Sequence, residues 1–411
     1  MKVTFIQPYY HNIWESLGIG YIASYCKNNY KGDLDLNFYH ANFDDDKEII
    51  NGSLDSDIIA FSCTTPSYDH GLRLSKEIKE KNKKIKSVFG GWHTTALKEK
   101  SFNEYVDQIV VGEGEKAFLQ ILNGDKEKII YGEKLNFIDL PFPDRDLIKN
   151  IRTINLCESM NGLRTASFQA NRGCPMNCAF CSELVMTGKF NSRTNNIRRR
   201  DISDLCNEIE EVTIKYNINY FKFVDATFDS SSDYVISFCK EKFKRGIKTN
   251  WESLIHASFV TEEMLFWMAK ANCKQINIGC ESGSEKILKD IGKGVKIDKI
   301  KKVLEWAKNY NIKRRCFFIL GMPRENIDDL KMTEKLIDET YPDVVGFTLL
   351  CPYPGSSLYD YEKYKNINWA ETDEYCNDFW RNDCFTNEEL KEWQQYFKLK
   401  YENGLCERQK K

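Results

Sequence analysis

The sequence predicts an α/β protein made of two successive series of strand–helix units, followed by a short helical region. Strand and helix patterns alternate about every 20 to 30 residues over residues 1–122 and again over residues 165–350. A rigid proline-rich segment, Pro141–Arg145, lies between the two series. Alternation of this kind is typical of parallel sheets that carry helices on their faces.

The first series predicts a doubly wound parallel sheet over residues 1–140. The expected strands are Met1–Gln7, Leu34–Tyr39, Ile58–Ser62, Ser87–Phe89 and Gln108–Val111, and the expected helices are Gly18–Asn28, Leu72–Lys81 and Glu115–Leu122. Ligands of such sheets bind at the carboxyl ends of the strands. Three loops rich in Gly, Ser and Thr follow strands of this series: Ser62–Pro66, Gly90–His93 and Gly112–Glu115. We therefore expect a binding edge at these loops.

The second series predicts six β/α units over residues 165–358. The expected strands are Thr165–Ala170, Tyr220–Val224, Thr249–Ile255, Gln275–Gly279, Arg315–Leu320 and Val344–Leu350. The expected helices are Ile202–Tyr216, Asp233–Arg245, Thr261–Ala271, Ser284–Ile291, Ile297–Asn309 and Ile327–Thr340. Six units are too few for a closed eight-unit barrel. Residues 141–164 are expected to link the two series, and residues 359–411 to form a C-terminal helical region.

The composition argues against several classes of protein. The 59 basic and 61 acidic residues nearly balance, so no broad nucleic-acid-binding surface is expected. No apolar stretch reaches the length of a membrane span, and Met1 leads into a strand pattern rather than a signal peptide. The 15 cysteines, without a secretion signal, are better explained as reduced thiols than as disulfides, which predicts a cytoplasmic protein.

Three cysteines, Cys174, Cys178 and Cys181, follow the first strand of the second series with the spacing C-x3-C-x2-C. Gly173 and Pro175 disfavour helix and strand there, so the thiols are expected to project from a loop. Three thiolates on one short loop can hold three irons of a [4Fe–4S] cluster and leave the fourth iron open to a small ligand. A tetrahedral zinc site would need a fourth ligand, and no suitably spaced Cys or His lies nearby in the sequence. The alternative is a set of three buried, inert cysteines.

This motif, with the aromatic residue Phe180 before its last cysteine, resembles the signature of radical S-adenosylmethionine (SAM) enzymes. The resemblance implies that the open iron binds the amino and carboxylate groups of SAM. It also implies that an electron from the cluster cleaves SAM to methionine and a 5′-deoxyadenosyl radical. Residues 165–358 would then form a partial (β/α)6, TIM-like barrel. An external electron donor, such as flavodoxin or ferredoxin, and an anaerobic setting are further implications.

Other residues at the carboxyl ends of the expected barrel strands are similar to this family. Residues 278–284 match its Ile-Gly-x-Glu-Ser-Gly-Ser pattern, which places Glu281 on the ribose side of SAM. The stretch Phe318–Pro323 resembles the strand and loop that cradle adenine. The resemblance therefore implies these SAM contacts: Phe180, Asp225, Glu281, Ser282, Phe318 and Gly321. The alternatives are a helix N-terminal carboxylate for Glu281, with Ser284 as the cap, and a capping or turn aspartate for Asp225.

The loops of the first series resemble the cobalamin-binding domain, a Rossmann-like fold found ahead of many radical SAM cores. Domains of this type carry D-x-H-x-x-G, S-x-L and G-G motifs, and this chain offers Gly18, Ser62-x-Thr64 and Gly90-Gly91 at similar separations. Glu15 occupies the position of the cobalt-ligating histidine, and we expect no side chain to replace that histidine directly. The implied cobalamin contacts are Trp14, Ser62, Thr64, Gly90, Gly91 and Gly112. The alternative is a degenerate sheet without a cofactor, whose glycines serve turns only.

Three hypotheses for the function follow. The first is cobalamin-dependent radical methylation of an unactivated carbon, or of a phosphinate-like centre, in a small-molecule or peptide substrate. The second is a radical cyclisation, ring rearrangement or oxidation, with cobalamin absent or in a role other than methylation. The third is a cobalamin or iron–sulfur sensor without turnover, which would not need a full set of SAM-contacting loops. The sequence does not name the substrate.

Overall fold

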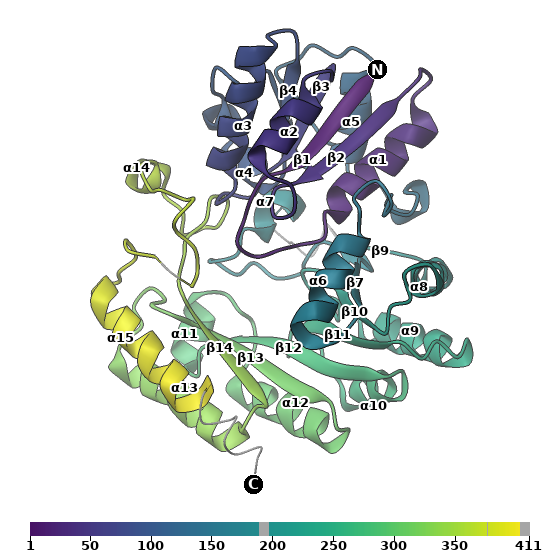
Figure 1. Ribbon diagram of the computed structural model, residues 1–411. Helices are drawn as coiled ribbons and strands as arrows, with labels where there is room; N and C mark the ends of the chain where they lie inside the picture. Colours follow the sequence, from purple (N-terminus) through teal and green to yellow (C-terminus); the bar gives the residue numbers. More distant parts are fainter. Residues whose placement is uncertain (189–196, 376, 403–411) are drawn as a thin grey trace. The chain divides into compact units, whose positions relative to one another are not determined.

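The computed structural model describes residues 1–188, 197–375 and 377–402, and the chain divides into two compact units (Figure 1). The first unit comprises Met1–Ala166, Leu184–Gly188 and Tyr353–Glu371. The second comprises Ser167–Glu183 and the described parts of Lys189–Pro352 and Thr372–Lys411. Each unit is organised around one six-stranded sheet.

The sheet of the first unit has parallel strands in the order β2-β1-β3-β4-β5-β6. They are β1 (Lys2–Gln7), β2 (Asp35–His40), β3 (Ile58–Ser62), β4 (Lys86–Gly90), β5 (Gln108–Val111) and β6 (Ile129–Tyr131). Helices α1 (Leu17–Asn29) and α5 (Gly114–Leu122) share one hydrophobic core with sheet residues such as Phe5. Helices α2 (Asp46–Ser53) and α3 (Tyr68–Lys81) share the other with residues such as Phe61. Helices thus cover both faces, and the predicted doubly wound parallel sheet is confirmed.

Several elements of this unit lie where the sequence predicted none, among them α2, β6, α4 (Trp92–Leu97) and α6 (Ile151–Asn161). Strand β6 is three residues long, and α6 buries only Thr153 and Ile154, so neither carries a visible period. The proline-rich segment is packed against α1. The amide of Asp144 donates to the carbonyl of Gly20 at 3.0 Å, and the Asp144 carboxylate pairs with Lys27 at 2.6 Å.

The sheet of the second unit has six strands in the order β14-β13-β12-β11-β10-β7. They are β7 (Thr165–Phe168), β10 (Tyr220–Phe223), β11 (Asn250–Ile255), β12 (Cys273–Glu281), β13 (Lys313–Leu320) and β14 (Val344–Leu349). The helices between them are α8 (Ile202–Tyr216), α9 (Ser232–Lys244), α10 (Glu262–Lys270), α11 (Glu285–Asp290), α12 (Ile297–Asn309) and α13 (Ile327–Thr340). Parallel strands with these helices along one side confirm the predicted partial (β/α)6 barrel (Figure 1).

The two faces of this second sheet differ in character. On the helix side, large side chains such as Phe221, Trp251 and Phe347 are fully buried. Helix α15 (Asn387–Phe397) joins that core, because the ring of Phe397 stacks on Phe347 with 4.9 Å between centroids. Alternate residues of a strand face opposite sides of its sheet. The opposite face is partly exposed and carries Glu252, Gln275, Asn277, Arg315, Phe317, Ile319 and Thr348.

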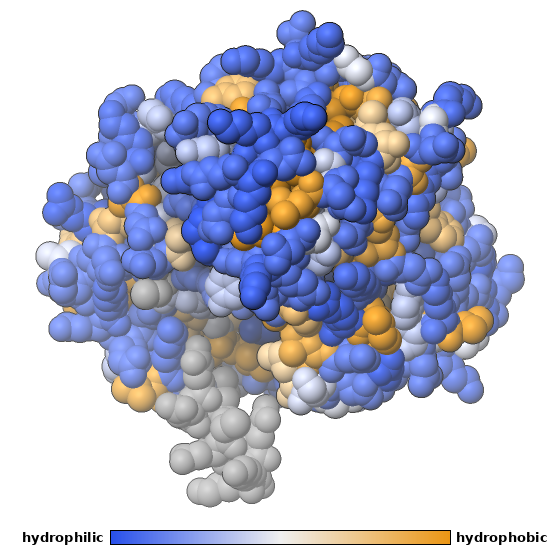
Figure 2. Space-filling model, turned by 45° about the horizontal axis from the view of Figure 1, so that its top comes forward, coloured by the Kyte–Doolittle hydropathy of each residue, from blue (hydrophilic) through white to orange (hydrophobic). Residues whose placement is uncertain are grey.

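Hydrophilic side chains predominate on the face shown in Figure 2, and hydrophobic ones gather there in small groups. None of the helices in the described parts of the chain combines the length and the apolar character that crossing a membrane requires.

Lys242 of α9 is a fully buried lysine that joins three segments of the second unit. Its Nζ donates to the carbonyls of Ile247 at 2.7 Å, Thr249 at 2.8 Å and Ala271 at 2.9 Å. Burial lowers the pKa of Lys242 to about 8. The side chain thus satisfies three buried acceptors near the starts of β11 and β12.

Replacing Lys242 with Met should destabilise the second unit, because three buried carbonyls lose their donor. An unsatisfied buried polar group costs about 1–3 kcal/mol, so we expect a loss of at least about 3 kcal/mol. Thermal and urea unfolding of the full chain measures it, with Lys244→Met, a change at an exposed lysine of the same helix, as the control. Equal unfolding midpoints for the two variants would contradict the prediction.

Candidate functional site

The loop with the three cysteines begins after β7 and the two-residue strand β8 (Asn171–Arg172). It turns at Gly173, whose φ of 104° is a conformation that glycine alone adopts readily. The loop then folds against the connection between α11 and α12. The amide of Ala179 donates to the carbonyl of Ile291 at 2.9 Å, and Cys178 Sγ lies 3.9 Å from the carbonyl oxygen of Gly292. This connection therefore positions the middle cysteine.

The three cysteines lie close to one another, with Cys178 buried and Cys174 and Cys181 partly buried. Burial raises the pKa of Cys178 to about 11, and burial together with the negative charges of Glu183, Cys178 and Cys174 raises that of Cys181 to about 12. Cys174 Sγ lies 3.0 Å from Thr227 Oγ1. Within the described residues, no three Cys, His, Asp or Glu side chains converge as the ligands of one metal ion would. A cubane cluster takes one thiolate per iron, so the donor set fits a cluster rather than zinc.

Asp225, two residues after the end of β10, anchors the start of the cysteine loop. Its Oδ1 accepts hydrogen bonds from the amides of Ala170 at 2.9 Å and Asn171 at 2.8 Å. Burial raises the pKa of Asp225 to about 8, although the two amides oppose that rise. Its Oδ2 is shielded from solvent and has no hydrogen-bond partner in the described structure. One oxygen therefore holds the loop, and the other makes no hydrogen bond to the described protein atoms.

Glu281, the last residue of β12, forms an ion pair with Lys293 in which Oε1 and Nζ are 2.7 Å apart. Both side chains are less than one-tenth exposed. Burial alone would lower the pKa of Lys293, but Glu281 and Cys178 raise it above its usual value. Glu281 has a φ of 62°, and a Cβ on Gly279 would lie only 2.4 Å from its Oε1. Glu281 and Lys293 thus occupy the space that a side chain at position 279 would fill. The pair lies close to Cys178, the middle cysteine.

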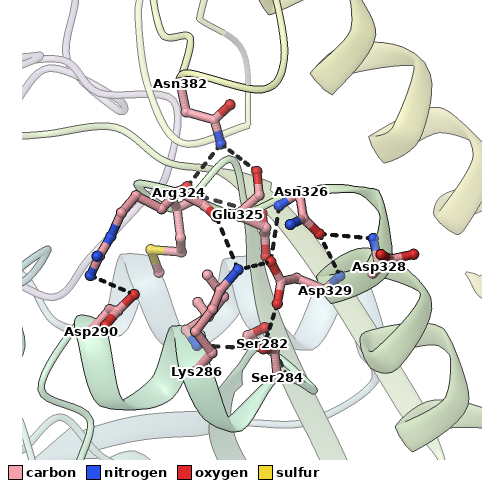
Figure 3. A network of polar contacts seen from close by, with 12 residues as sticks. Ser282, Ser284, Lys286, Asp290, Arg324, Glu325, Asn326, Asp328, Asp329 and Asn382 are labelled. Atoms are coloured by element: carbon pink, nitrogen blue, oxygen red, sulfur yellow. Dashed lines mark hydrogen bonds and ion pairs between the residues drawn. The ribbon is translucent and has the colours of Figure 1, made fainter.

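The loops after β12 and β13 are tied together by Asp329 of α13 (Figure 3). Its Oδ1 accepts from Ser284 Oγ at 2.6 Å, and its Oδ2 accepts from Lys286 Nζ at 2.5 Å and from the amide of Asn326 at 3.0 Å. The network in Figure 3 therefore fixes the start of α11 relative to the loop 321–326.

Glu325 organises the loop after β13 from within. Its Oε2 accepts from the amides of Gly321 at 2.7 Å and Met322 at 3.3 Å. Burial raises the pKa of Glu325 to about 8, and Oε1 is buried with no hydrogen-bond partner among the described atoms. This residue, like Asp225, uses one carboxylate oxygen for a loop and leaves the second unpaired.

The C-terminal segment braces the same loop from outside. Trp380 Nε1 donates to the carbonyl of Gly321 at 2.7 Å, and Asn382 Nδ2 donates to the carbonyls of Met322 at 2.9 Å and Glu325 at 3.0 Å. Gly321 has a φ of 84°, and a Cβ there would approach Leu390 to 2.8 Å. Only glycine fits this turn.

The remaining expected SAM contacts lie in different surroundings. Ser282 is fully buried, and its Oγ accepts from the amide of Ser284 at 3.2 Å. Phe318 is in the helix-side core, where its ring stacks on Phe347 at 5.7 Å. Phe180 is partly buried in the cysteine loop. The structure therefore brings the cysteines, Asp225, Glu281 and Gly321 to the carboxyl ends of the strands, and directs the Phe318 ring to the other side.

In the first unit, most of the expected cobalamin contacts meet at the carboxyl ends of β3, β4 and β5. Ser62 and Gly90 end neighbouring strands in register. Gly91 has a φ of 96°, and a Cβ there would lie 2.6 Å from the carbonyl oxygen of Cys63. Thr64 and Gly112 follow β3 and β5, and their amides donate to Ser67 Oγ and Thr95 Oγ1, each at 3.0 Å.

Large aromatic side chains are exposed at this same edge. Trp14 and Tyr9, in the loop after β1, are 56% and 52% exposed, and Trp92, after β4, is 36% exposed. Glu15 is buried and lies 3.5 Å from Arg145. Exposed aromatic surface beside close-packed backbone suits a broad, flat, apolar ligand. A corrin ring has that character.

Sequence reasoning did not identify Lys293, Glu325, Trp380 or Asn382. Two local signals were present in the sequence. Lys293 lies between two glycines, and Glu325 lies four residues after Gly321 in the same loop. Trp380 and Asn382 gave no signal, because their partners are about 60 residues away in the chain.

Comparisons with known proteins agree with this geometry. The family model of the radical SAM superfamily matches residues 169–337, and that of the B12 binding domain matches residues 8–122. An uncharacterized methyltransferase of Pyrococcus horikoshii is 27% identical over 377 residues, which cover 86% of this chain and 81% of that protein. The anaerobic magnesium-protoporphyrin IX monomethyl ester cyclase of Rubrivivax gelatinosus is 26% identical over 413 residues, with 89% and 73% covered.

The fold is also similar to a solved structure. The radical SAM methyltransferase TsrM from Kitasatospora setae, with cobalamin and a [4Fe–4S] cluster bound, has a TM-score of 0.68 and 14% sequence identity, over 87% of this chain and 73% of that one. The two family models fall on the two sheets described above, one on each. Residues 169–337 therefore match the radical SAM superfamily, and residues 8–122 match the B12 binding domain.

Proposed function

We propose that this chain is a cobalamin-dependent radical SAM enzyme that methylates an unactivated carbon, or a phosphinate-like centre, of a small-molecule or peptide substrate. The observation that carries the proposal is the site of the second unit. Three adjoining thiols share the carboxyl end of one sheet with two buried carboxylate oxygens, Asp225 Oδ2 and Glu325 Oε1, that have no partner in the described structure. The matched domains and the methyltransferase relative support the same function.

The residues present fit a [4Fe–4S] cluster and SAM. Cys174, Cys178 and Cys181 would hold the cluster, with one thiolate for each of three irons. The ammonium group and ribose hydroxyls of SAM are hydrogen-bond donors, and the carboxylates of Asp225 and Glu281 suit them. For Ser282, Phe318 and Gly321 we propose contacts through the backbone, since the first two side chains are buried. Phe180 would contribute its ring from the cysteine loop.

The first unit fits cobalamin at the edge formed by Ser62, Thr64, Gly90, Gly91 and Gly112. Trp14 would cover one side of the corrin ring, and Glu15, whose side chain is buried 3.5 Å from Arg145, would not serve as a cobalt ligand. When bound, the cluster with SAM supplies hydrogen abstraction and cobalamin supplies the methyl group. The protein's own residues bind and orient the substrate and the cofactors, and they exclude water from the site.

A second candidate is radical cyclisation or ring rearrangement without methyl transfer. The cyclase relative, similar over 89% of this chain, supports it. Transfer of a methyl group to the substrate distinguishes the two, because bound cobalamin is compatible with both.

We also propose a cytoplasmic setting and an external electron donor such as flavodoxin or ferredoxin, without nucleic acid as a partner. The cysteines within the described ranges are free thiols, and the nearly balanced charge gives no basis for nucleic-acid binding.

Replacing Cys174, Cys178 and Cys181 with Ala should abolish cluster binding. Wild-type protein reconstituted without oxygen should bind about four irons and four sulfides and cleave SAM to 5′-deoxyadenosine. The triple variant should do neither, whereas Cys384→Ala, at an exposed free cysteine, should match the wild type. Wild-type iron content in the triple variant would refute the central claim.

Glu281→Gln should weaken SAM binding about 10- to 100-fold, the effect of losing one charged hydrogen bond. Isothermal titration of cluster-loaded protein with SAM measures it, and iron content should not change. Glu305→Gln, at an exposed residue of α12, is the control.

The double variant Glu281→Gln/Lys293→Met separates two roles of this carboxylate. If Glu281 contacts SAM, the double variant binds SAM as weakly as Glu281→Gln. Recovery of wild-type affinity in the double variant would mean that Glu281 serves only to neutralise Lys293.

The full chain should bind one cobalamin with its benzimidazole tail displaced and no nitrogen on the lower face of cobalt. Absorption and electron paramagnetic resonance spectra measure this. Nitrogen hyperfine splitting would instead indicate an imidazole ligand on cobalt. Gly91→Ala should abolish loading, because the added Cβ meets the Cys63 backbone. Gly124→Ala is the control, since φ there is 94° but no atom lies within 4 Å of an added Cβ. If wild-type protein loads no cobalamin, the methylation proposal fails.

A further inference from the structure

The partly exposed face of the second sheet carries Arg315, a partly buried cation that has no counterion among the described residues. Arg314 and Arg315 are neighbours on β13 and point to opposite sides. Arg314 is buried and fully paired: its Nε lies 2.9 Å from Asp343 Oδ2, and its Nη atoms donate to the carbonyls of Thr340 and Tyr341. Arg315 has no ion pair with any carboxylate that the structure describes, and its Nε is shielded from solvent without a hydrogen-bond partner.

Glu252, a carboxylate on the same face two strands away, already has its own hydrogen-bond donors. Asn277 pairs in register with Arg315, and its Nδ2 lies 3.4 Å from Glu252 Oε1. Glu252 Oε2 accepts from Tyr220 Oη at 3.1 Å and from Gln275 Nε2 at 3.2 Å. Glu252 therefore has three donors of its own and does not neutralise Arg315.

The guanidinium group of Arg315 points toward the end of the strand where the cysteine loop lies. Its Cζ is 4.8 Å from the ring centroid of Phe317, two residues nearer that end. Burial raises the pKa of Tyr375, and the charge of Arg315 opposes that rise. The residue before Tyr375 accepts a hydrogen bond from the amide of Leu349, the last residue of β14, at 2.8 Å. Arg315 thus reaches toward the carboxyl ends of β13 and β14.

Apolar side chains share this face with Arg315. Leu254, which pairs in register with Asn277, is 36% exposed, and Phe317 and Ile319 are partly exposed on β13. A partly buried guanidinium group without an acceptor is a costly arrangement that an oxyanion relieves, and its planar fork matches a carboxylate or a phosphate. The surroundings combine one such cation with an apolar surface.

We propose that Arg315 binds an oxyanion, carboxylate or phosphate, of a substrate whose apolar body packs on Leu254, Phe317 and Ile319. This inference rests on the proposed function, because it names a substrate class for the same site. Arg315 then selects substrates that carry a negatively charged group and binds that end of the substrate.

The test is direct binding to the cluster-loaded full chain, which needs no turnover. Octanoate, octyl phosphate and octan-1-ol share one apolar chain and differ in the head group. Equilibrium dialysis should show that at least one anionic probe binds the wild type about tenfold or more tightly than octan-1-ol does. The tighter of the two anions tells carboxylate from phosphate.

Arg315→Gln should weaken that anion about 10- to 100-fold and leave octan-1-ol unchanged. Lys313→Gln, which removes an exposed cation from the same strand, should have no effect. Arg315→Lys keeps the charge without the fork, so an intermediate loss is expected and provides a second reading if Arg315→Gln folds poorly.

The proposal is overturned if octan-1-ol binds as tightly as the anions, if no probe binds the wild type, or if both Arg315 variants retain full affinity. Cluster content and SAM cleavage, measured on the same samples, test the proposed function separately.

Discussion

Lys293 and Glu281 form an ion pair that solvent barely reaches, and a different part of the fold holds each residue. Lys293 lies in the connection between α11 and α12, whose backbone receives the amide of Ala179 from the cysteine loop. Glu281 ends β12 in a left-handed backbone conformation. Removing one partner of a buried pair costs about 3–5 kcal/mol, because the other charge stays buried without compensation. The ion pair thus fixes the cysteine loop to β12, because that loop is hydrogen-bonded to the connection that carries Lys293.

Both units use the same physical rule for different chemistry. The carboxyl ends of neighbouring parallel strands meet at one edge, so residues far apart in the chain become neighbours there. In the first unit the edge offers backbone and aromatic surface, since Gly91 leaves no room for a side chain and Trp14 is exposed. In the second unit the edge offers thiols and carboxylates. The same architecture, with different loops, therefore suits a flat apolar ligand in the first unit and a charged ligand in the second.

The sequence was most informative where the signal is local. The cysteine spacing, the six strands of the second series and the glycine loops of the first all depend on residues close together in the chain. Position 318 shows where such reasoning stops. A one-residue irregularity between Gly279 and Glu281 places Phe318 opposite Glu281 in the register, yet the Phe318 ring faces the helix-side core. A family pattern does not reveal which way a side chain points.

Tertiary partners account for the other residues that sequence reasoning missed. Lys293 has no periodicity around it, and its role depends on a strand end 12 residues earlier. Glu325 reads as an ordinary loop acid until its burial and its amide partners are known. Strand β6 is stabilised by its pairing with β5, and helix α2 by the core that it shares with α3, rather than by their own patterns.

The bracing of the Gly321 loop by Trp380 and Asn382 has a consequence for biosynthesis. These contacts join residues 59 and 60 positions apart, and the segment that makes them follows every strand of both sheets. A chain emerging from the ribosome can therefore assemble its first sheet and most of its second while this loop still lacks its brace. Contacts of such sequence separation form late, because loop closure costs entropy before the contact is made. The site is completed only when the C-terminal segment has been synthesised, and an incomplete chain that ends before Trp380 carries the cysteines without the finished loop beside them.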